Sequence, residues 1–425
     1  MADMSDPSNR EVKKEKLDLL WQQIAERFKD KDEKLLFEVL NEPAGEGSEE
    51  EIAEIARHYN DINERVLDVI RSSGGENGTR NVLLPGVLTN IDYTIDYFEV
   101  PTDDHIILTV HNYDPWDFVS NWWGKTSWGS PGELTYFDEL FGRLNQRFPN
   151  LPVVIGEYGT LATNEKRSKW LYHDTFVRAA ASYGMATMWW DNGADQFDRN
   201  ARVFRDPIVK DIIIHASEDT ANAILGKAST YLQENEPVGE VDIEIAYNGQ
   251  SLNNITDSNG SLEEGTDYVM TSDGIQLLPS YLEALPTHLG EVESVVFGFT
   301  GGADQTLSFI RYNTPDVQTT ELLIDEAAMT DAKVPVSFNG TTLATVKAMN
   351  LVNGEEAMPV KDEWTVNLPE DQQGRLNEGS DFWVDEESVY LSKDVLNQVN
   401  GEAMFTLEFW PRERQTNVEL LVRRK

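Results

Sequence analysis

Cysteine is absent from the 425 residues of the sequence. Disulfide bonds, thiolate catalysis and zinc sites built on cysteine are therefore excluded. Long hydrophobic runs are absent as well, because no stretch approaches the roughly 20 apolar residues that a membrane-spanning helix needs. The first residues lead straight into charged positions, without the apolar core of a secretory signal peptide. We therefore expect neither a membrane anchor nor a signal peptide in this chain.

Basic residues are scarce: 35 Lys and Arg stand against 75 Asp and Glu, which gives a formal net charge of −40. A surface this negative repels nucleic acids and anionic membranes, so neither is expected as a partner. It also keeps a protein soluble at high salt, where ions screen the self-repulsion. The charge fits a halophilic or alkaline habitat and an ordinary acidic secreted protein equally well, and the sequence leaves both open.

Strand-like and helix-like stretches alternate over the first half of the chain. Apolar residues recur at helical spacing in residues 11–28, 49–73, 137–148, 167–183 and 209–216. Short apolar runs typical of buried strands occupy residues 35–40, 81–86, 106–110, 151–155 and 185–190. A polar stretch separates the second and third of these runs. The alternation predicts a parallel sheet covered by helices, with the carboxyl ends of the strands meeting at one face.

The pattern changes beyond about residue 217, where strands become short and alternate between apolar and polar residues, as in residues 241–245. Turn signals separate them: Asn248-Gly249, Asn259-Gly260, Asp273-Gly274, Asn339-Gly340, Asn353-Gly354 and Asn400-Gly401. The sequence thus predicts three parts, a first domain of residues 1–217 and two all-β sandwich modules of residues 218–313 and 314–425.

Two of the predicted strands lead into a glutamate. Residues 35–40 run into the sequence Asn-Glu-Pro at 41–43, where the proline stops the ladder after Glu42. Residues 151–155 run into Glu157 in the same way. Two carboxyl groups at one face are what a glycosidase needs, one as proton donor and one as nucleophile or base. Each glutamate alone would fit an exposed loop equally well, whereas the pair favours catalysis.

Polar and aromatic residues follow two further strands. His111 and Tyr113 alternate at one strand end, so their side chains are expected on the same side. Tyr113 could bind a catalytic carboxylate, and His111 a sugar hydroxyl or the proton donor, although a lone buried histidine is more often a core residue. Trp189 and Trp190 end the last strand on opposite sides, so one could support a sugar ring while the other packs on a helix. Four more tryptophans in a polar loop are expected to stack on sugars rather than to lie in the core: Trp116, Trp122, Trp123 and Trp128.

Four motifs occur in a fixed order: Leu-Asn-Glu-Pro at 40–43, His-Asn-Tyr at 111–113, Ile-Gly-Glu-Tyr-Gly at 155–159 and Trp-Trp-Asp-Asn-Gly at 189–193. In this order the sequence resembles glycoside hydrolase family 5, most closely the retaining (β/α)8-barrel endoglucanases and xyloglucanases of its subfamily 4. The resemblance implies the following roles: general acid/base for Glu42, nucleophile for Glu157, 2-hydroxyl contact for Asn41, a supporting pair of His111 and Tyr113, and sugar stacking for Trp189, with Trp190 second.

The mechanism implied by this resemblance is double displacement. Glu157 would attack the anomeric carbon while Glu42 protonates the departing oxygen, and Glu42 would then activate a water. Glu42 would have to keep its proton at the working pH, and the two carboxyl groups should lie about 5–5.5 Å apart. No metal or organic cofactor is implied.

The resemblance covers only part of a barrel, because five strands are predicted where the family has eight. The absent strands are the first three, together with an Arg and a His that the family carries on them. The expected fold is therefore the C-terminal part of a (β/α)8 TIM barrel, strands four to eight. Its open edges should favour self-association or binding of the missing N-terminal barrel segment.

The downstream modules also resemble known ones. Residues 265–268 and 277–285 look like an Ig-like module, and the last 110 or so residues resemble a family 46 carbohydrate-binding module. Trp383, after a Gly-Ser-Asp run at 379–381, is the leading candidate for a glucan contact among Trp364, Phe382, Trp383 and Trp410; the alternative is that all four lie in the core.

Two functions follow and stay open at this stage. The first is a secreted retaining endo-β-1,4-glucanase that hydrolyses cellulose or related β-glucans such as mixed-linkage glucan and xyloglucan. The second is a catalytically incompetent chain that only binds glucan through its β-modules.

Overall fold

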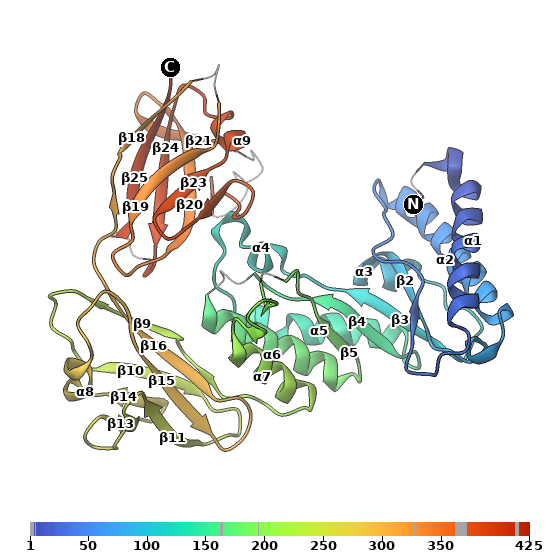
Figure 1. The fold of residues 1–425 in the computed structure, drawn as a ribbon, viewed down its shortest axis with the longest axis horizontal. Helices are drawn as coiled ribbons and strands as arrows, with labels where there is room; N and C mark the ends of the chain where they lie inside the picture. Colours follow the sequence, from blue (N-terminus) through green and yellow to red (C-terminus); the bar gives the residue numbers. More distant parts are fainter. Residues whose placement is uncertain are drawn as a thin grey trace. The chain divides into compact units, whose positions relative to one another are not determined.

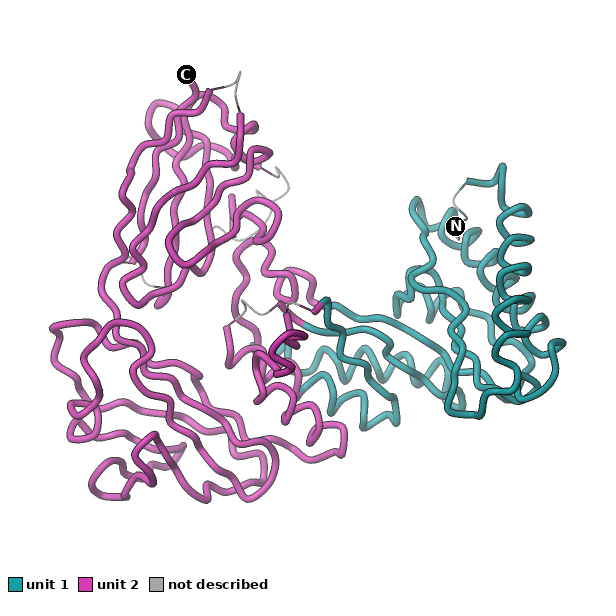
Figure 2. The backbone as a smooth tube through the Cα atoms, viewed as in Figure 1, with its two compact units in different colours: residues 1–113, 130–159, 175–192 teal, residues 114–129, 160–174, 193–425 magenta. Residues whose placement is uncertain are grey.

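The computed structural model describes residues 4, 6–161, 165–193, 195–325, 329–361, 372–412 and 416–425. The chain forms two compact units, shown in teal and magenta in Figure 2. Unit 1 comprises Met1–Tyr113, Ser130–Gly159 and Thr175–Asn192, and unit 2 comprises Asp114–Gly129, Thr160–Asp174 and Gly193–Lys425. Residues of the expected first domain therefore belong to both units, and each unit is described separately below.

Unit 1 is built on a five-stranded sheet in the order β1-β2-β3-β4-β5, with every neighbouring pair parallel. Its strands are β1 (Phe37–Glu38), β2 (Val82–Asn90), β3 (Ile106–His111), β4 (Val153–Tyr158) and β5 (Ala186–Trp189). The predicted parallel sheet is confirmed. Only β1 is much shorter than expected, with Phe37–Glu38 in place of residues 35–40. After Glu38 the chain makes one more ladder bond, from Val39 N to Leu83 O at 3.1 Å, and then enters the turn at 41–43.

Helices cover this sheet, as Figure 1 shows. In unit 1 they are α1 (Arg10–Phe28), α2 (Glu49–Ser72), α3 (Ile91–Tyr97), α5 (Pro131–Arg147) and the second half of α6 (Lys166–Ser182), which is shared between the units. Helix α7 (Pro207–Ser217) belongs to unit 2. The short helical turns are η1 (Pro7–Asn9), η2 (Gly75–Gly78), α4 (Trp116–Val119) and η3 (Trp122–Gly124). Helices α1 and α2 run parallel, as their ion pairs Lys14–Asp61 and Arg65–Asp18 require.

Two helix predictions were wrong in detail. The stretch between β2 and β3 was expected to be only polar connection, yet it contains α3, whose first turn is capped by the Asn90 side chain accepting from Tyr93 N at 3.0 Å. Helix α5 begins at Pro131 rather than Phe137, because Ser130 and Glu133 form a capping box with a 2.8 Å bond from Ser130 N to Glu133 Oε2.

A buried arginine fixes the turn between α1 and β1. Arg80 is 2% exposed, and its guanidinium donates to the carbonyl oxygens of Phe28, Lys31, Asp32 and Leu35. It also lies over the Phe37 ring, 5.0 Å from the ring centroid. A buried cation needs full hydrogen-bonding, and here backbone carbonyls supply it. The strand that leads to Glu42 is thereby held at its amino end.

Unit 2 contains the tryptophan loop, residues 114–129, packed on residues 160–174. Trp128 is 4% exposed and packs against Phe118 and Tyr172. The expectation that Trp128 stacks on a sugar is therefore wrong, because its partners bury it. The same loop contacts the end of the chain: Asn121 Nδ2 donates to Glu378 Oε2 at 2.7 Å, and Arg412 donates to the carbonyl of Gly124 at 3.0 Å.

Beyond α7, the rest of unit 2 is rich in β-strands, which agrees with the prediction of β modules, although it also contains two short helices. The middle part has sheets ordered β13-β14-β10-β8 and β12-β11-β15-β16-β9, and the last part has sheets ordered β17-β19-β23-β22 and β18-β25-β24-β20-β21. A small hairpin, β6 (Phe197–Asp198) with β7 (Val203–Phe204), precedes them. The middle strands are β8 (Ile224–Leu225), β9 (Ser229–Gln233), β10 (Val241–Ala246), β11 (Leu252–Asp257), β12 (Gly260–Ser261), β13 (Tyr268–Met270), β14 (Gly274–Leu277), β15 (Gly290–Phe299) and β16 (Gln305–Tyr312), with the helix α8 (Pro279–Ala284). The last strands are β17 (Asp316–Val317), β18 (Glu321–Ile324), β19 (Ala332–Ser337), β20 (Leu343–Val352), β21 (Glu355–Pro359), β22 (Phe382–Val384), β23 (Ser388–Leu391), β24 (Glu402–Phe409) and β25 (Val418–Arg424), with the helix α9 (Lys393–Leu396).

Each β part has its own apolar core. The expected Asn-Gly turns at 248–249, 339–340 and 353–354 have positive φ at both residues, which is the geometry of tight hairpins. The module limits at 217 and 313 stay predictions. Among the described residues, no helix is both long and apolar enough to cross a membrane.

Candidate active site

Glu157 lies in β4, opposite His111 of β3 in the parallel ladder. The Tyr113 hydroxyl donates to Glu157 Oε2 at 2.8 Å, and the Glu157 side chain is 21% exposed. The residue before it has to be small, because a Cβ on Gly156 would lie 3.1 Å from both His111 Nε2 and Thr109 Oγ1. Glu157 is therefore fixed by the strand behind it and by a hydroxyl donor in front.

Glu42 lies beyond the end of β1 and has a left-handed backbone, with φ of 41°. Its Oε1 is 2.8 Å from His111 Nδ1, and its side chain is 44% exposed. The same Nδ1 is 3.7 Å from Glu157 Oε2. His111 is 7% exposed and thus stands between the two carboxylates, where Nδ1–H donates to Glu42.

The surroundings of Tyr113 change its pKa. Burial and the neighbouring Glu157 carboxylate raise the pKa of Tyr113 far above its ordinary value of 10.0. The phenol therefore keeps its proton at any ordinary pH and acts as a hydrogen-bond donor to Glu157.

The structure brings four of the predicted site residues together: Glu42, His111, Tyr113 and Glu157. Asn41 is exposed next to Glu42. Trp189 is half-buried at the end of β5, close enough to Gly159 that an added Cβ there would lie 3.6 Å from Trp189 Cδ1. Trp190 is 42% exposed. Their substrate contacts stay predictions, as does that of Trp383.

The remaining aromatic candidates differ in how far their side chains are buried. Trp116 is 48% exposed and meets Trp122 edge to face, with ring centroids 5.6 Å apart. In the last module Phe382 is 1% exposed and belongs to the core, whereas Trp383 and Trp410 are half-buried. Trp364 lies outside the described residues.

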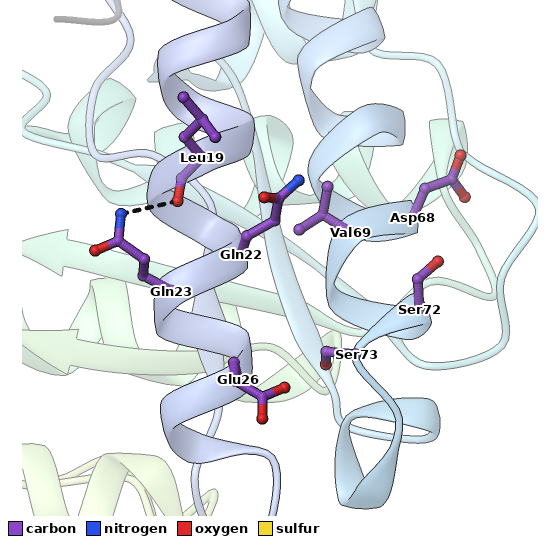
Figure 3. A pocket seen from close by; sticks show the side chains of 8 residues that line it. All are labelled: Leu19, Gln22, Gln23, Glu26, Asp68, Val69, Ser72 and Ser73. Atoms are coloured by element: carbon purple, nitrogen blue, oxygen red, sulfur yellow. Dashed lines mark hydrogen bonds between the residues drawn. The ribbon is translucent and has the colours of Figure 1, made fainter.

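A divalent cation would find suitable donors here. Glu42, His111 and Glu157 each offer one ligand atom, and these three atoms lie within 4.8 Å of one another. Two carboxylates and an imidazole can hold a metal ion, and they can equally carry out acid–base and nucleophilic catalysis without one. The groove between α1 and α2 in Figure 3 is a separate feature, since none of its lining residues, Leu19, Gln22, Gln23, Glu26, Asp68, Val69, Ser72 and Ser73, is a predicted site residue.

Both the sequence and the overall structure of this chain are similar to those of known proteins. Residues 1–196 match the model of Cellulase (glycosyl hydrolase family 5). A crystal structure of a tri-modular GH5 (subfamily 4) endo-beta-1,4-glucanase from Bacillus licheniformis, complexed with cellotetraose, is 39% identical to this chain, with a TM-score of 0.89. The match covers 98% of this chain and 78% of that one. The chain belongs to glycoside hydrolase family 5.

Other relatives and a second family model extend this result. Endoglucanase B of Paenibacillus lautus is 27% identical over 420 residues, covering 93% of this chain and 70% of that protein. Endoglucanase 1 of Ruminococcus albus is 35% identical over 198 residues, covering 45% of this chain and 48% of its own length. Residues 224–309 match the Carbohydrate binding domain X2 model, whereas the Ig-like description of this module stays a prediction.

Sequence reasoning found the two carboxylates and their neighbours but missed the residues that hold the Glu42 turn. Tyr59 of α2 is 1% exposed and donates to the carbonyl of Ala44 at 2.6 Å. In the sequence Tyr59 is one member of an apolar helical stripe, and only the presence of a hydroxyl among aliphatic side chains distinguishes it.

Proposed function

We propose that this chain carries the acid/base and the nucleophile of a retaining endo-β-1,4-glucanase. The observation that carries the proposal is the spacing of Glu42 and Glu157, because an oxygen of each lies within 4.8 Å of the other. Retaining glycosidases keep their carboxyl groups about 5–5.5 Å apart, whereas inverting enzymes leave about 6.5–9.5 Å for a water. The short spacing supports retention.

The contacts support a division of roles. Glu157 Oε2 accepts from Tyr113, which leaves Oε1 to attack the anomeric carbon. Glu42 Oε1 accepts from His111 and its carboxylate is the more exposed, which leaves Oε2 to carry the proton. In the first step the bond from Glu157 to the anomeric carbon forms, the glycosidic bond breaks, and Glu42 protonates the leaving oxygen. In the second step Glu42 takes a proton from water, whose oxygen attacks the same carbon and releases Glu157.

The proposed substrate is a β-1,4-glucan. The relatives' names and the cellotetraose in the Bacillus licheniformis structure support this class, and cellulose, mixed-linkage glucan and xyloglucan are the candidates. In this proposal Asn41 contacts the 2-hydroxyl and Trp189 stacks on a sugar. Polymers of this size are degraded outside the cell, so we also propose that the protein is secreted.

The last module is proposed to be a family 46-like carbohydrate-binding module that contacts the same polymer through Trp383. Trp383 and Tyr390 pair across β22 and β23, and their rings are stacked 5.5 Å apart and 4° from parallel. One face of the indole is therefore covered by Tyr390. Because β22 is an edge strand, the opposite face of the indole points away from the sheet, which suits a pyranose ring.

We further propose that β1–β5 correspond to strands four to eight of the family's barrel. Both β1 and β5 are edge strands of the described sheet, and at the β5 edge Met188 is 49% exposed. Three further strands would pair with these edges and carry the remaining parts of the site.

Activity assays test the proposal directly. Reducing-sugar release from carboxymethylcellulose, lichenan and xyloglucan is compared between wild type and Glu157→Gln, each extended by the three N-terminal barrel strands of the family, with and without EDTA. The proposal expects release by the wild type, almost none by the variant, and no effect of EDTA. The alternative, a chain that only binds glucan, is favoured by the carbohydrate-binding match at 224–309 and expects both proteins to be retained on the polymers without release. Loss of release in EDTA would instead assign a metal to Glu42, His111 and Glu157.

A further inference from the structure

The two catalytic carboxylates are held in different ways. Glu157 is part of a ladder, where Asn112 N donates to the Glu157 carbonyl at 3.0 Å. Glu42 follows the end of β1 and has the left-handed φ of 41°. Residues other than glycine seldom adopt this conformation, so the surroundings have to hold it.

Each of the three residues after Glu42 meets a fixed neighbour. The carbonyl of Pro43 accepts from Leu88 N at 2.9 Å. The carbonyl of Ala44 accepts from the Tyr59 hydroxyl at 2.6 Å. Gly45 lies against β2, because a Cβ at this position would be 2.6 Å from Val87 Cγ1. The turn that carries Glu42 is thus held from β2 on one side and from α2 on the other.

The neighbours on both sides have unusual or buried positions of their own. Leu88 and Thr89 have φ of 55° and 52°, which is rare for a leucine and rarer for a β-branched threonine. Tyr59 lies in the buried face of α2, and its hydroxyl also accepts from Met4 N at 3.3 Å. A hydroxyl that is 1% exposed in an apolar stripe has to be hydrogen-bonded, and here its acceptor is the Glu42 turn.

We infer that Tyr59 is a positioning residue for the acid/base Glu42. Its hydroxyl fixes the Ala44 carbonyl and so the backbone turn that aims the Glu42 carboxyl at the glycosidic oxygen. This inference rests on the proposed function. Because the Tyr59 hydroxyl contacts the turn that carries the acid/base, its loss should affect steps that need the Glu42 proton and leave nucleophilic attack unchanged.

The test is Tyr59→Phe in the chain extended by the three N-terminal barrel strands of the family. The measured quantity is kcat/KM for two substrates, a β-glucan oligosaccharide and 2,4-dinitrophenyl cellobioside, whose leaving group needs no proton. We expect a loss of about tenfold on the oligosaccharide, equivalent to one hydrogen bond, and no loss on the dinitrophenyl substrate. Tyr183→Phe is the matched control, because it removes an exposed hydroxyl that donates to Asp138, and it should change neither value.

A second variant reaches the same turn from β2. Gly45→Ala forces the turn away from Val87 and should give the same substrate-dependent loss, while circular dichroism shows that both variants are folded. Equal losses on both substrates, or wild-type values on both, would overturn the inference. Glu157→Gln is assayed in parallel: if it retains turnover the proposed function is wrong, whereas an inactive Glu157→Gln with a uniform Tyr59→Phe effect contradicts only the role of Tyr59.

Discussion

Glu42 and Glu157 have the same side chain but different surroundings, which suit them to the different roles that we propose for them. Glu157 is the less exposed of the two and receives the Tyr113 hydroxyl. Glu42 is 44% exposed and receives the Nδ1 of His111. A donor that never loses its proton stabilises a nucleophilic carboxylate, whereas an exposed carboxyl can exchange protons with a leaving oxygen and with water.

This division predicts different kinetics for Glu157→Gln and Glu42→Gln. Glu157→Gln should lower turnover of every substrate by about 10⁴-fold or more while glucan binding remains, because an amide cannot attack. Glu42→Gln should still release a burst of dinitrophenolate from the activated glycoside, followed by slow turnover, because only the second step then needs a base. Stopped-flow absorbance measures both phases. Equal loss of burst and steady state in the two variants would contradict the assigned roles.

At the residue scale, the sequence predicted side chains that stand at strand ends and missed those defined by distant packing. Glu42, His111, Tyr113 and Glu157 follow buried runs, and the parallel sheet brings such positions together. Trp128 appeared to be a loop residue, but Phe118 and Tyr172 bury it. Local polarity does not show that a loop folds back onto a helix.

At the scale of single elements, helix α6 contains a buried histidine that makes the stability of the fold depend on pH. His173 of α6 is fully buried, and burial, together with Lys169, lowers its pKa from 6.5 to about 3. Below pH 6.5 the unfolded chain therefore binds a proton at His173, whereas the folded chain does not bind it until the pH is much lower. The corresponding stability is present above pH 6.5 and is lost as the pH falls towards 3.

His173→Gln should therefore flatten the pH dependence of stability. Between pH 6.5 and 4.5 the wild type should lose up to about 1.4 kcal/mol per pH unit through this group, and the variant should lose that much less. Urea unfolding at pH 7.5, 6 and 5 measures the difference. His288→Gln is the control, since His288 is exposed and its removal should leave the slope unchanged. An identical slope in wild type and His173→Gln would show that another group causes the acid sensitivity.

Phe382 and Trp383 are adjacent in β22, so their side chains lie on opposite faces of the sheet. Trp383→Ala should lower activity on branched or insoluble glucan several-fold, with little effect on short oligosaccharides. The reason is that the sugar ring can no longer stack on the indole. Phe382→Ala is the matched comparison: Phe382 is 1% exposed, so its truncation should cost about 3–5 kcal/mol of stability without substrate dependence. A Trp383→Ala variant that only melts earlier would show that this tryptophan belongs to the core.

Sequence periodicity predicted most elements but failed where the signal was short or local. The seven residues of α3 are too few for a clear period, and its start depends on the Asn90 cap. The first turn of α5 carries few apolar residues, and the capping box of Ser130 and Glu133 marks it instead. Strand β1 was predicted too long because Leu35 and Leu36 continue the apolar run, although they lie outside the ladder and Arg80 binds the carbonyl of Leu35.

At the scale of the whole molecule, the open sheet is the feature with the largest consequence. Strands β1 and β5 are the two edges of the sheet, and at the β5 edge the apolar side chain of Met188 is exposed. Such edges pair with other strands, and a site open to water loses much of the electrostatic stabilisation on which glycosidases depend.

The isolated 425-residue chain should therefore self-associate and have at most trace endoglucanase activity. Adding the three N-terminal barrel strands of the family should give a monodisperse protein and restore turnover. Sedimentation velocity and dye release from a coloured glucan measure both properties on the same sample. A fully active monomer of the chain alone would contradict the assignment of β1–β5 to strands four to eight.

The stereochemistry of the first product tests the account most directly. With the chain extended by the three N-terminal barrel strands of the family, ¹H NMR during hydrolysis of a soluble cello-oligosaccharide resolves the anomeric proton of the new reducing end before mutarotation. Because one carboxylate oxygen of Glu42 and one of Glu157 lie within 4.8 Å of each other, double displacement is expected and the β-anomer should appear first. Initial appearance of the α-anomer would mean a single displacement by water and would contradict the role of Glu157 as nucleophile.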